Sequence, residues 1–192
     1  MVRSSIIGRA VIAAVADAAG GAFSYARAQN PAEAHAHKSS VGIPESMHAE
    51  HAEIHEALVR ATKVKGPVGA AARELAALLD PHFAREEQIA LPPLGLLVPL
   101  SRGELTPEMR AVLPMTDSLR AELPRMLEEH KAIRSATLRM IKVATANGNA
   151  TVKSFGERLA AHARSEEEMF YPMALIVGDV VRARSAPSVS RR

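Results

Sequence analysis

The feature that most constrains the fold of this chain is a long stripe of residues at helical spacing in its second half. Between Leu119 and Ala144, mostly apolar residues recur at alternating steps of four and three residues. The stripe consists of Leu119, Leu123, Met126, His130, Ile133, Thr137, Met140 and Ala144. Side chains three or four residues apart lie on one face of an α-helix. The stripe therefore predicts one long helix with a single buried face.

Three other segments carry the same spacing. The first stripe contains Met47, His51, Ile54, Leu58 and Lys65. The second contains Leu75, Leu78, His82, Glu86 and Ile89. The last contains Val152, Phe155, Leu159, His162, Glu166, Met169 and Met173. Each segment predicts another amphipathic helix.

Turn signals separate these predicted helices. The first helix starts at Pro44 and ends at KGP, residues 65–67. The second runs over residues 68–91 with Pro81 inside it, where the missing backbone hydrogen bond should bend the helix. The third ends at NGN, residues 147–149, with a glycine C-cap. The turns after the first and third helices are therefore short.

The connection between the second and third helices is longer. Residues 92–115 are rich in Pro and Gly but also apolar. We expect them to pack over the helices, with a short helix that begins at Thr106-Pro107-Glu108. The sequence thus predicts an all-α fold, a four-helix bundle with a long apolar connection between helices 2 and 3.

Composition supports a helical domain and excludes several classes of function. Of the 192 residues 47% are hydrophobic, which suits one domain, and only 3% are aromatic, so strand signals are absent. The net charge is +3 without a basic stripe, so we expect no nucleic-acid partner. No stretch reaches the roughly 20 apolar residues of a membrane span. Without cysteine, imidazole and carboxylate are the expected metal ligands.

Both ends of the chain differ from its middle. Residues 1–28 resemble a secretory signal peptide, with Arg3, an apolar middle and Ala26-Arg27-Ala28 before Gln29. Residues 29–43 are predicted as a linker, 44–177 as the helical domain and 178–192 as a disordered tail. We therefore expect a periplasmic or secreted protein, and a cytoplasmic one if the first residues are instead an amphipathic helix.

Two pairs of polar residues interrupt the apolar stripes at matching places. His82 and Glu86 form one HxxxE pair, and His162 and Glu166 form another. The helix before each pair carries Glu-His-x-x-Ile, at residues 50–54 within AEHAEI and 129–133 within EEHKAI. The chain is therefore a tandem repeat in which each half brings two imidazoles and one carboxylate to the core.

The chemistry that needs these groups together is a dinuclear metal site. A carboxylate can bridge two cations roughly 3.5–4 Å apart, and histidines can fill the terminal positions. Buried charges must be paired or must coordinate metal, so histidines that serve only in packing are the weaker hypothesis. Ligation by nitrogen and oxygen suits Fe, Mn or Zn. The predicted ligands are His51, His82, Glu86, His130, His162 and Glu166.

The ligand residues follow the order H…HxxxE…H…HxxxE, and each HxxxE helix has a doubled glutamate and a following proline. This pattern resembles that of the hemerythrin-like family, the HHE cation-binding domain. The resemblance implies an up-down four-helix bundle around a non-haem di-iron centre with an oxo or hydroxo bridge. It implies that the four histidines are terminal ligands and that Glu86 and Glu166 bridge the irons. It also implies binding or sensing of O₂, NO or iron.

Several neighbours bear on this expectation. The oxygen-carrying members have HxxxH on the third helix, but here the second histidine is replaced by Arg134, so we expect no reversible O₂ carriage. His55 lies one turn from His51 and could join or replace it, although a supporting position beside the ligands is favoured. Arg134 and Tyr171 are likewise expected beside the ligands. Glu87 and Glu167 are expected either beside the ligands or at the surface.

Two function hypotheses follow. The first is a di-iron module that binds or senses O₂, NO or iron. The second is a di-iron enzyme that consumes peroxide or NO, for which the sequence marks no catalytic residue besides the metal ligands. The oligomeric state is not determined by the sequence.

Overall fold

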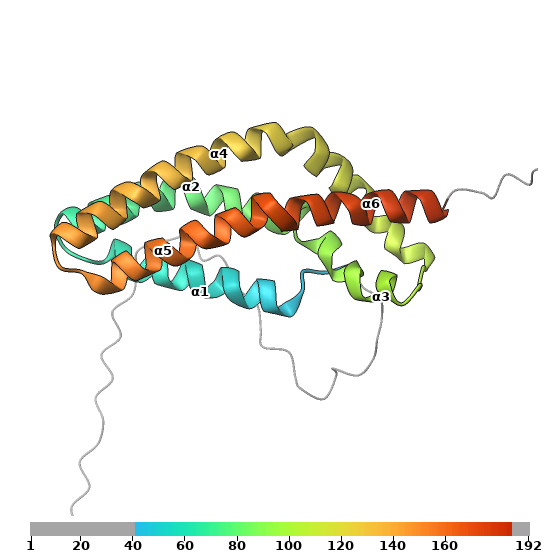
Figure 1. The fold of residues 1–192 in the computed structure, drawn as a ribbon, viewed down its shortest axis with the longest axis horizontal. Coiled ribbons are helices and arrows are strands. Elements are labelled where there is room, and N and C mark those ends of the chain that lie inside the picture. The colour runs from blue at the N-terminus through green and yellow to red at the C-terminus, as the bar shows by residue number, and fades with distance from the viewer. Residues whose placement is uncertain (1–40, 186–192) are drawn as a thin grey trace, which may run out of the picture. The chain divides into compact units, whose positions relative to one another are not determined.

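The structure, a computed structural model, describes residues 41–185, and its regular elements are all helical. Within these residues there is no strand, and four long helices dominate (Figure 1). The first three are α1 (Glu45–Thr62), α2 (Pro67–Ile89) and α4 (Leu113–Ala146). The fourth is formed by α5 (Ala150–Ser165), the π-helical η4 (Glu166–Phe170) and α6 (Tyr171–Ser185), which follow one another without a break.

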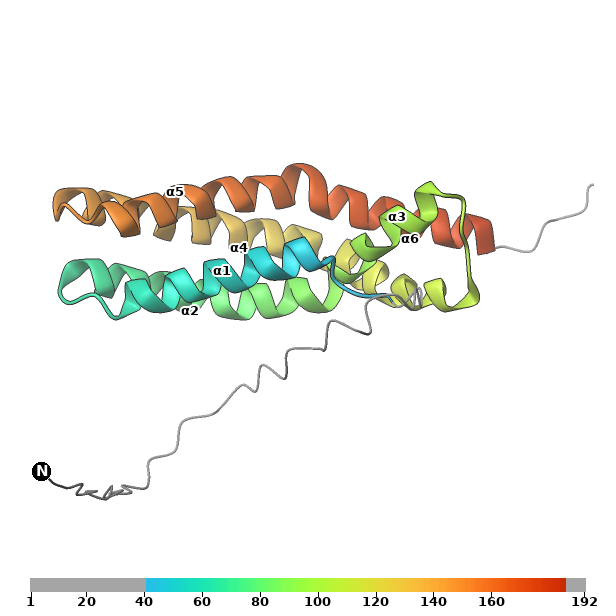
Figure 2. The ribbon, with the colours of Figure 1, turned by 90° about the horizontal axis from the view of Figure 1, so that it is seen from below.

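The four long helices pack side by side around a shared apolar core (Figure 2). α1 contacts α2 and α5, α2 contacts α4, and α4 contacts α5 and α6. The core at one end of these helices includes Leu58, Leu75, Met140, Phe155 and Leu159, which are nearly inaccessible to solvent. These residues come from the predicted stripes, so the spacing of apolar residues identified core residues in all four helices.

The segment between α2 and α4 forms three short helices: η2 (Pro92–Leu96), α3 (Leu97–Ser101) and η3 (Pro107–Val112). η2 and η3 both contact α6. Leu96, Met109 and Val112 pack there against Val177 and Val181. The predicted short helix does begin at Pro107, but the Thr106 side chain makes no capping hydrogen bond.

The glycine turns lie where they were predicted. α1 ends at Thr62, and Gly66 has φ +75° before Pro67 opens α2. α4 ends before Gly148, whose φ of +66° is in the left-handed region that favours glycine. The amide of Val152 then donates to Asn149 Oδ1 at 3.0 Å, which caps α5. The predicted glycine C-cap of the third helix is confirmed.

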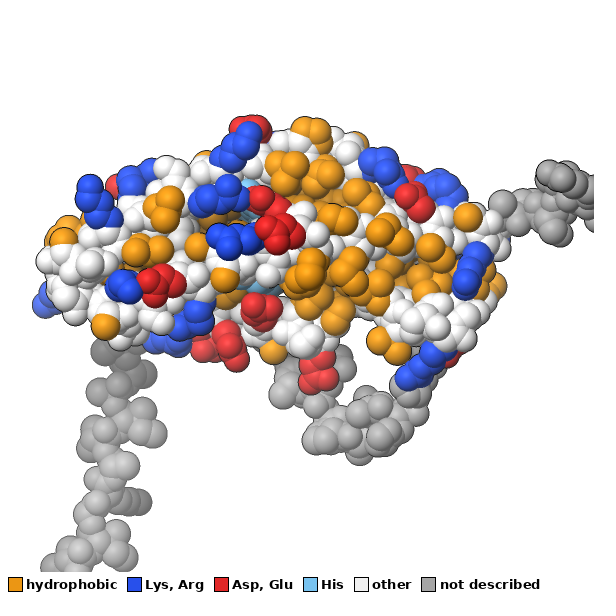
Figure 3. Space-filling model, in the orientation of Figure 1, with side chains coloured by type: hydrophobic (Ala, Val, Ile, Leu, Met, Phe, Trp, Pro, Cys, Tyr) orange, Lys and Arg blue, Asp and Glu red, His pale blue; other side chains and the backbone are white. Residues whose placement is uncertain are grey.

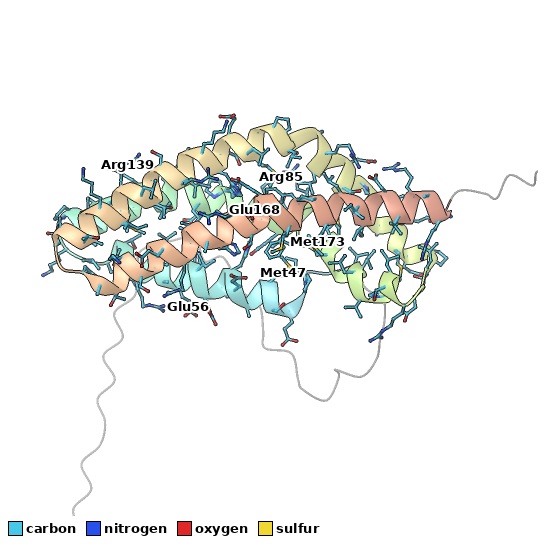
Figure 4. The ribbon with its side chains drawn as sticks, in the orientation of Figure 1. Met47, Glu56, Arg85, Arg139, Glu168 and Met173 are labelled. Atoms are coloured by element: carbon cyan, nitrogen blue, oxygen red, sulfur yellow. The ribbon has the colours of Figure 1, made fainter. Side chains whose placement is uncertain are left out.

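The prediction was wrong for the inward face of the fourth helix beyond Glu166. Met169 and Met173 were expected in the core, but they are 49% and 37% exposed, and Met173 is labelled in Figure 4. Tyr171 and Ala174 are buried instead. A π-helical turn at Glu166–Phe170 adds one residue to the helical repeat, so every later side chain is rotated by about 100°. Steps of three and four residues cannot describe such a turn.

Two stripe positions elsewhere also differ from the prediction. Leu78 is 38% exposed, whereas Leu79 is buried together with Ala72 and Phe83. The predicted stripe of α2 is therefore wrong at Leu78, whereas its other four positions are buried as predicted. Lys65 lies beyond the end of α1 and is exposed.

The predicted tail also begins too early. α6 continues to Ser185, so residues 178–185 are helical and not disordered. Gly178 does not end the helix: a Cβ there would lie 2.3 Å from Thr116 Oγ1, so glycine permits close contact with α4. Val181 is buried one turn later. The predicted signal peptide, most of the linker and residues 186–192 lie outside the described residues.

The surface of the described domain is divided. In Figure 3 apolar side chains gather over α6, while charged side chains are frequent over the opposite half. Met169, Met173 and Ile176 are among the exposed apolar residues of the fourth helix. Within residues 41–185, no helix has both the length and the apolar character needed to cross a membrane.

Candidate metal centre

The six predicted ligands are all buried in the interior, each with an exposed fraction of 5% or less. They fall into two groups, and within each group one nitrogen or carboxylate oxygen per residue lies within 4.8 Å of the others. The His82 group contains His82, Glu86 and His130, and the His51 group contains His51, His162 and Glu166. Each group is close enough to hold a metal ion.

The groups do not coincide with the two halves of the sequence repeat. The His82 group takes two residues from α2 and one from α4. The His51 group takes one residue from α1 and two from the fourth helix. Each HxxxE pair is thus completed by a histidine from the other half, a division that the sequence had not revealed.

The His82 group brings two imidazoles and a carboxylate against a phenol. His82 Nε2 lies 3.4 Å from Glu86 Oε1, and His130 Nε2 lies 3.8 Å from the same oxygen. The Tyr171 hydroxyl donates to Glu86 Oε1 and lies 3.4 Å from His82 Nε2 and 3.1 Å from His130 Nε2. Tyr171 was expected beside the ligands, and its oxygen lies inside this group.

The His51 group is enclosed by a different aromatic residue. Glu166 Oε1 lies 2.8 Å from His162 Nε2 and 3.5 Å from His51 Nε2. Phe83 stacks on the His51 ring with centroids 4.2 Å apart, and its edge meets His162 at 5.9 Å. Phe83 lies off the predicted stripe of α2, so the sequence analysis did not select it.

Glu166 connects the two groups. While its Oε1 faces His51 and His162, its Oε2 lies 3.5 Å from His130 Nε2 in the His82 group. Its two oxygens thus face different sets of imidazoles, which is the arrangement of a carboxylate that bridges two cations. Glu86 Oε1 faces His82 and His130, and the charge of Glu86 also raises the pKa of His51 in the other group.

Every imidazole of the site turns its second nitrogen, Nδ1, toward a carboxylate nearer the surface. The contacts are Glu129 with His82 at 2.8 Å, Glu167 with His130 at 2.9 Å, Glu50 with His162 at 3.2 Å and Glu87 with His51 at 3.4 Å. At His82 and His130 the contact is a hydrogen bond; since a carboxylate only accepts, Nδ1 carries the hydrogen there and Nε2 faces the centre. The longer contacts at His51 and His162 bring the charges together without forming a hydrogen bond. Such partners fix the orientation and tautomer of metal-binding histidines.

Two of these outer carboxylates were predicted and two were not. Glu87 and Glu167 were expected beside the ligands or at the surface, and they contact histidines of neighbouring helices. Glu50 and Glu129 received no role, although each directly precedes a repeated histidine. Their recurrence within the Glu-His-x-x-Ile motif was the signal that could have identified them.

The remaining predicted neighbours lie outside the two groups. Arg134 is 47% exposed, and its Nη2 donates at 2.6 Å to Glu167 Oε1, the oxygen that also contacts His130. Arg134 thus contacts a ligand only through Glu167, in the supporting position where it was expected. His55 is half-buried and belongs to neither group.

The charges of the centre are strongly coupled. Burial lowers the pKa of His51, but contacts with Glu166 and Glu87 outweigh it and raise this pKa to about 9. Burial also lowers the pKa of His82, but contacts with Glu86 and Glu129 outweigh burial and raise this pKa to about 8. Protons on these imidazoles therefore balance the buried carboxylates at neutral pH. A metal cation that binds must replace such protons.

Buried polar atoms without hydrogen-bond partners lie at the centre. Within residues 41–185 they include both ring nitrogens of His51 and of His162, together with Glu86 Oε2 and Glu166 Oε1. Buried polar atoms are rarely left unpaired, because each costs desolvation free energy. A divalent cation would satisfy nitrogen lone pairs and carboxylate oxygens together. The donor set therefore fits metal ions that accept nitrogen and oxygen ligands, such as Fe, Mn or Zn.

The helical fold and its two adjacent groups of buried histidine and glutamate are those of a cation-binding helical domain. Residues 43–174 match the family model of the Hemerythrin HHE cation binding domain. This match covers more than half of the chain, so the protein belongs to this family, as its motifs had indicated. Comparison with curated proteins and with solved structures gives no match.

Proposed function

We propose that this protein is an up-down four-helix bundle that holds two iron ions and uses them to bind or sense O₂, NO or iron itself. In this proposal the His82 group holds one ion and the His51 group holds the other. The ligands are the six residues His51, His82, Glu86, His130, His162 and Glu166. Manganese or zinc would fit the same donors.

The observation that carries this proposal is the position of Glu166. One of its oxygens lies 2.8 Å from His162 Nε2, and the other lies 3.5 Å from His130 Nε2. A single buried carboxylate therefore serves both groups, as a dinuclear centre requires and two independent sites do not.

The protein supplies orientation and enclosure. The outer carboxylates hold each imidazole so that its Nε2 faces the centre. Phe83 excludes water from one side of His51 by stacking on its ring. Bound iron would supply open coordination positions and a change of oxidation state. Binding of a small diatomic molecule needs the open position, and sensing by oxidation needs the change of oxidation state, whereas a purely structural metal site needs neither.

The test is a titration of the reduced, iron-loaded protein with NO under anaerobic conditions, followed by absorption and electron paramagnetic resonance. We expect saturable formation of an iron–nitrosyl spectrum. On mixing with O₂ we expect rapid oxidation without a long-lived oxygen complex. No spectral change with either gas would contradict the binding function. Sustained consumption of peroxide or NO would instead favour the enzyme.

We further propose that residues 1–28 direct export, so that the mature protein is periplasmic or secreted. The support is the apolar segment followed by Ala26-Arg27-Ala28. Amino-terminal sequencing of the protein from its native host should give Gln29 or a residue close to it. A chain that still begins at Met1 or Val2 would exclude cleavage.

A further inference from the structure

The hydroxyl of Tyr171 occupies an unusual place for a side chain outside the HxxxE pairs. It lies within 3.4 Å of the Nε2 atoms of both His82 and His130, and it donates to Glu86 Oε1. These are the three atoms that would hold the metal of the His82 group. Tyr171 is almost fully buried, so its oxygen is held there by packing.

The distances from the Tyr171 oxygen to the two imidazole nitrogens are those between donors to one ion. Ligands at about 2.1 Å from a metal are separated from each other by about 3.0 Å at right angles and about 3.4 Å in a tetrahedron. The Tyr171 oxygen lies 3.1 Å from His130 Nε2 and 3.4 Å from His82 Nε2. The phenol oxygen therefore has the position of a fourth donor of the His82 group.

The backbone explains how Tyr171 reaches this position. Its N–H donates to the carbonyl of Glu166, five residues earlier, at the end of the π-helical turn. In the other half of the repeat, the N–H of Leu91 donates in the same way to the carbonyl of Glu86 at 3.0 Å. The residue that corresponds to Tyr171 is thus Leu91, which has no donor atom. π-Helical turns are frequent at functional sites.

We propose that Tyr171 is a seventh protein ligand, binding through its phenol oxygen the metal that is held by His82, Glu86 and His130. This inference rests on the proposed dinuclear site. As the metal–oxygen bond forms, the phenol proton leaves to solvent. The two metal positions are then chemically different: the His82 group has four protein donors, and the His51 group keeps more positions open for small molecules.

The experiment compares the unmodified protein with Tyr171→Phe after loading with Fe³⁺. A phenolate bound to Fe³⁺ gives a charge-transfer band in the visible spectrum and phenolate modes in resonance Raman spectra excited within that band. Tyr25→Phe is the matched control when all samples are made as the full 192-residue chain, because Tyr25 and Tyr171 are the only tyrosines of that chain. Iron content and circular dichroism are measured on all three samples.

We expect the band in the unmodified protein and in Tyr25→Phe, and its loss in Tyr171→Phe while iron content and helical signal persist. A protein with two irons and no phenolate band would overturn the role of Tyr171 alone. Loss of the band in Tyr25→Phe but not in Tyr171→Phe would do the same. Absence of bound iron in the unmodified protein would overturn the dinuclear site as well.

Discussion

The His82 group and the His51 group come from the same sequence repeat, yet their surroundings differ. In the His82 group the phenol oxygen of Tyr171 lies among the metal-facing atoms. In the His51 group the neighbouring aromatic residue is Phe83, which stacks on an imidazole and offers no donor. The repeat thus preserves the imidazoles and carboxylates but not the groups that surround them.

The outer carboxylates show a second difference. Those of the His82 group are paired with arginines: Glu129 with Arg125 at 3.5 Å and Glu167 with Arg134 at 2.6 Å. Among residues 41–185, no lysine or arginine forms an ion pair with Glu50 or Glu87 of the His51 group. The His51 group therefore keeps more negative charge around it, which favours a cation there.

This comparison suggests how a duplicated helix pair can produce two unequal metal positions. One position would be nearly filled by protein donors, whereas the other would keep room for an exogenous ligand. Substitutions at the ligands and at their carboxylate partners should therefore affect the two positions unequally.

The largest effect should come from Glu166→Ala. Because Glu166 faces imidazoles of both groups, its loss should remove most of the metal from both positions. Glu86→Ala should empty the His82 group first, because the oxygen of Glu86 contacts His82 and His130. Metal content per chain, measured after desalting, checks both variants.

The matched control for these variants is Glu168→Ala. Glu168 lies two residues from Glu166 on the same turn, but its side chain is exposed (Figure 4). It should retain the metal content of the unmodified protein. Equal loss in Glu168→Ala and Glu166→Ala would show that the inward face has been misassigned.

A smaller effect is expected at the outer carboxylates. Glu129→Ala should weaken metal binding at the His82 group, and Glu50→Ala at the His51 group, each by about 10- to 100-fold. The reason is that Glu129→Ala removes the acceptor that orients His82, and Glu50→Ala removes the carboxylate that lies 3.2 Å from His162 Nδ1. Competition with a chromophoric chelator measures the affinity. Glu128→Ala, next to Glu129 but paired at the surface with Lys131, should change it little.

The metal-free protein should lose stability as the pH rises above neutrality. The pKa values of His51 and His82 are raised to about 9 and about 8 from an ordinary value of 6.5. The protonated imidazoles therefore stabilise the fold below about pH 6.5, and this contribution disappears as the pH rises through 8 to 9. Urea denaturation of the metal-free protein at pH 6.5 and 9.5 should show a lower midpoint at the higher pH.

The metal-loaded protein provides the comparison for this pH effect. Metal replaces the protons of the imidazoles, so its binding should release protons and become tighter as the pH rises. Calorimetric titrations in buffers of different ionisation enthalpy measure the release. An unchanged denaturation midpoint in the metal-free protein would show that the imidazoles do not carry these protons.

The smallest effect should come from Arg134→Ala. Arg134 is 47% exposed and contacts Glu167, which contacts His130. Exposed ion pairs contribute up to about 1 kcal/mol, so the affinity for metal should change by less than about fivefold. A larger loss, measured with the same chelator competition, would place Arg134 in the metal site itself.

The sequence predicted the fold well where one helical period holds. Leu119, Met126, Ile133 and Met140 are all buried as the stripe of α4 required. The prediction was wrong after Glu166 because a π-helical turn changes the number of residues per helical turn. No residue type in the sequence indicates such a turn. The predicted tail also began too early, because α6 continues to Ser185 and Gly178 packs closely against Thr116 within that helix.

The sequence identified the residues of the candidate site but not how they divide between the two groups. The two HxxxE pairs and the repeated histidines identified six residues that are now found buried in two adjacent groups. That they bind metal stays a prediction. How the histidines divide between groups depends on which helices are neighbours, and this is a tertiary property. The place of Tyr171 depends on the π-helical turn, so the sequence could not show it.

The most direct test of a dinuclear centre is X-ray absorption at the iron edge on the fully loaded protein. The proposed site predicts nitrogen and oxygen neighbours, with imidazole scattering, and a second iron within about 4 Å of the first. Bound iron without an iron neighbour at that distance would contradict the assignment of Glu166 as a bridge.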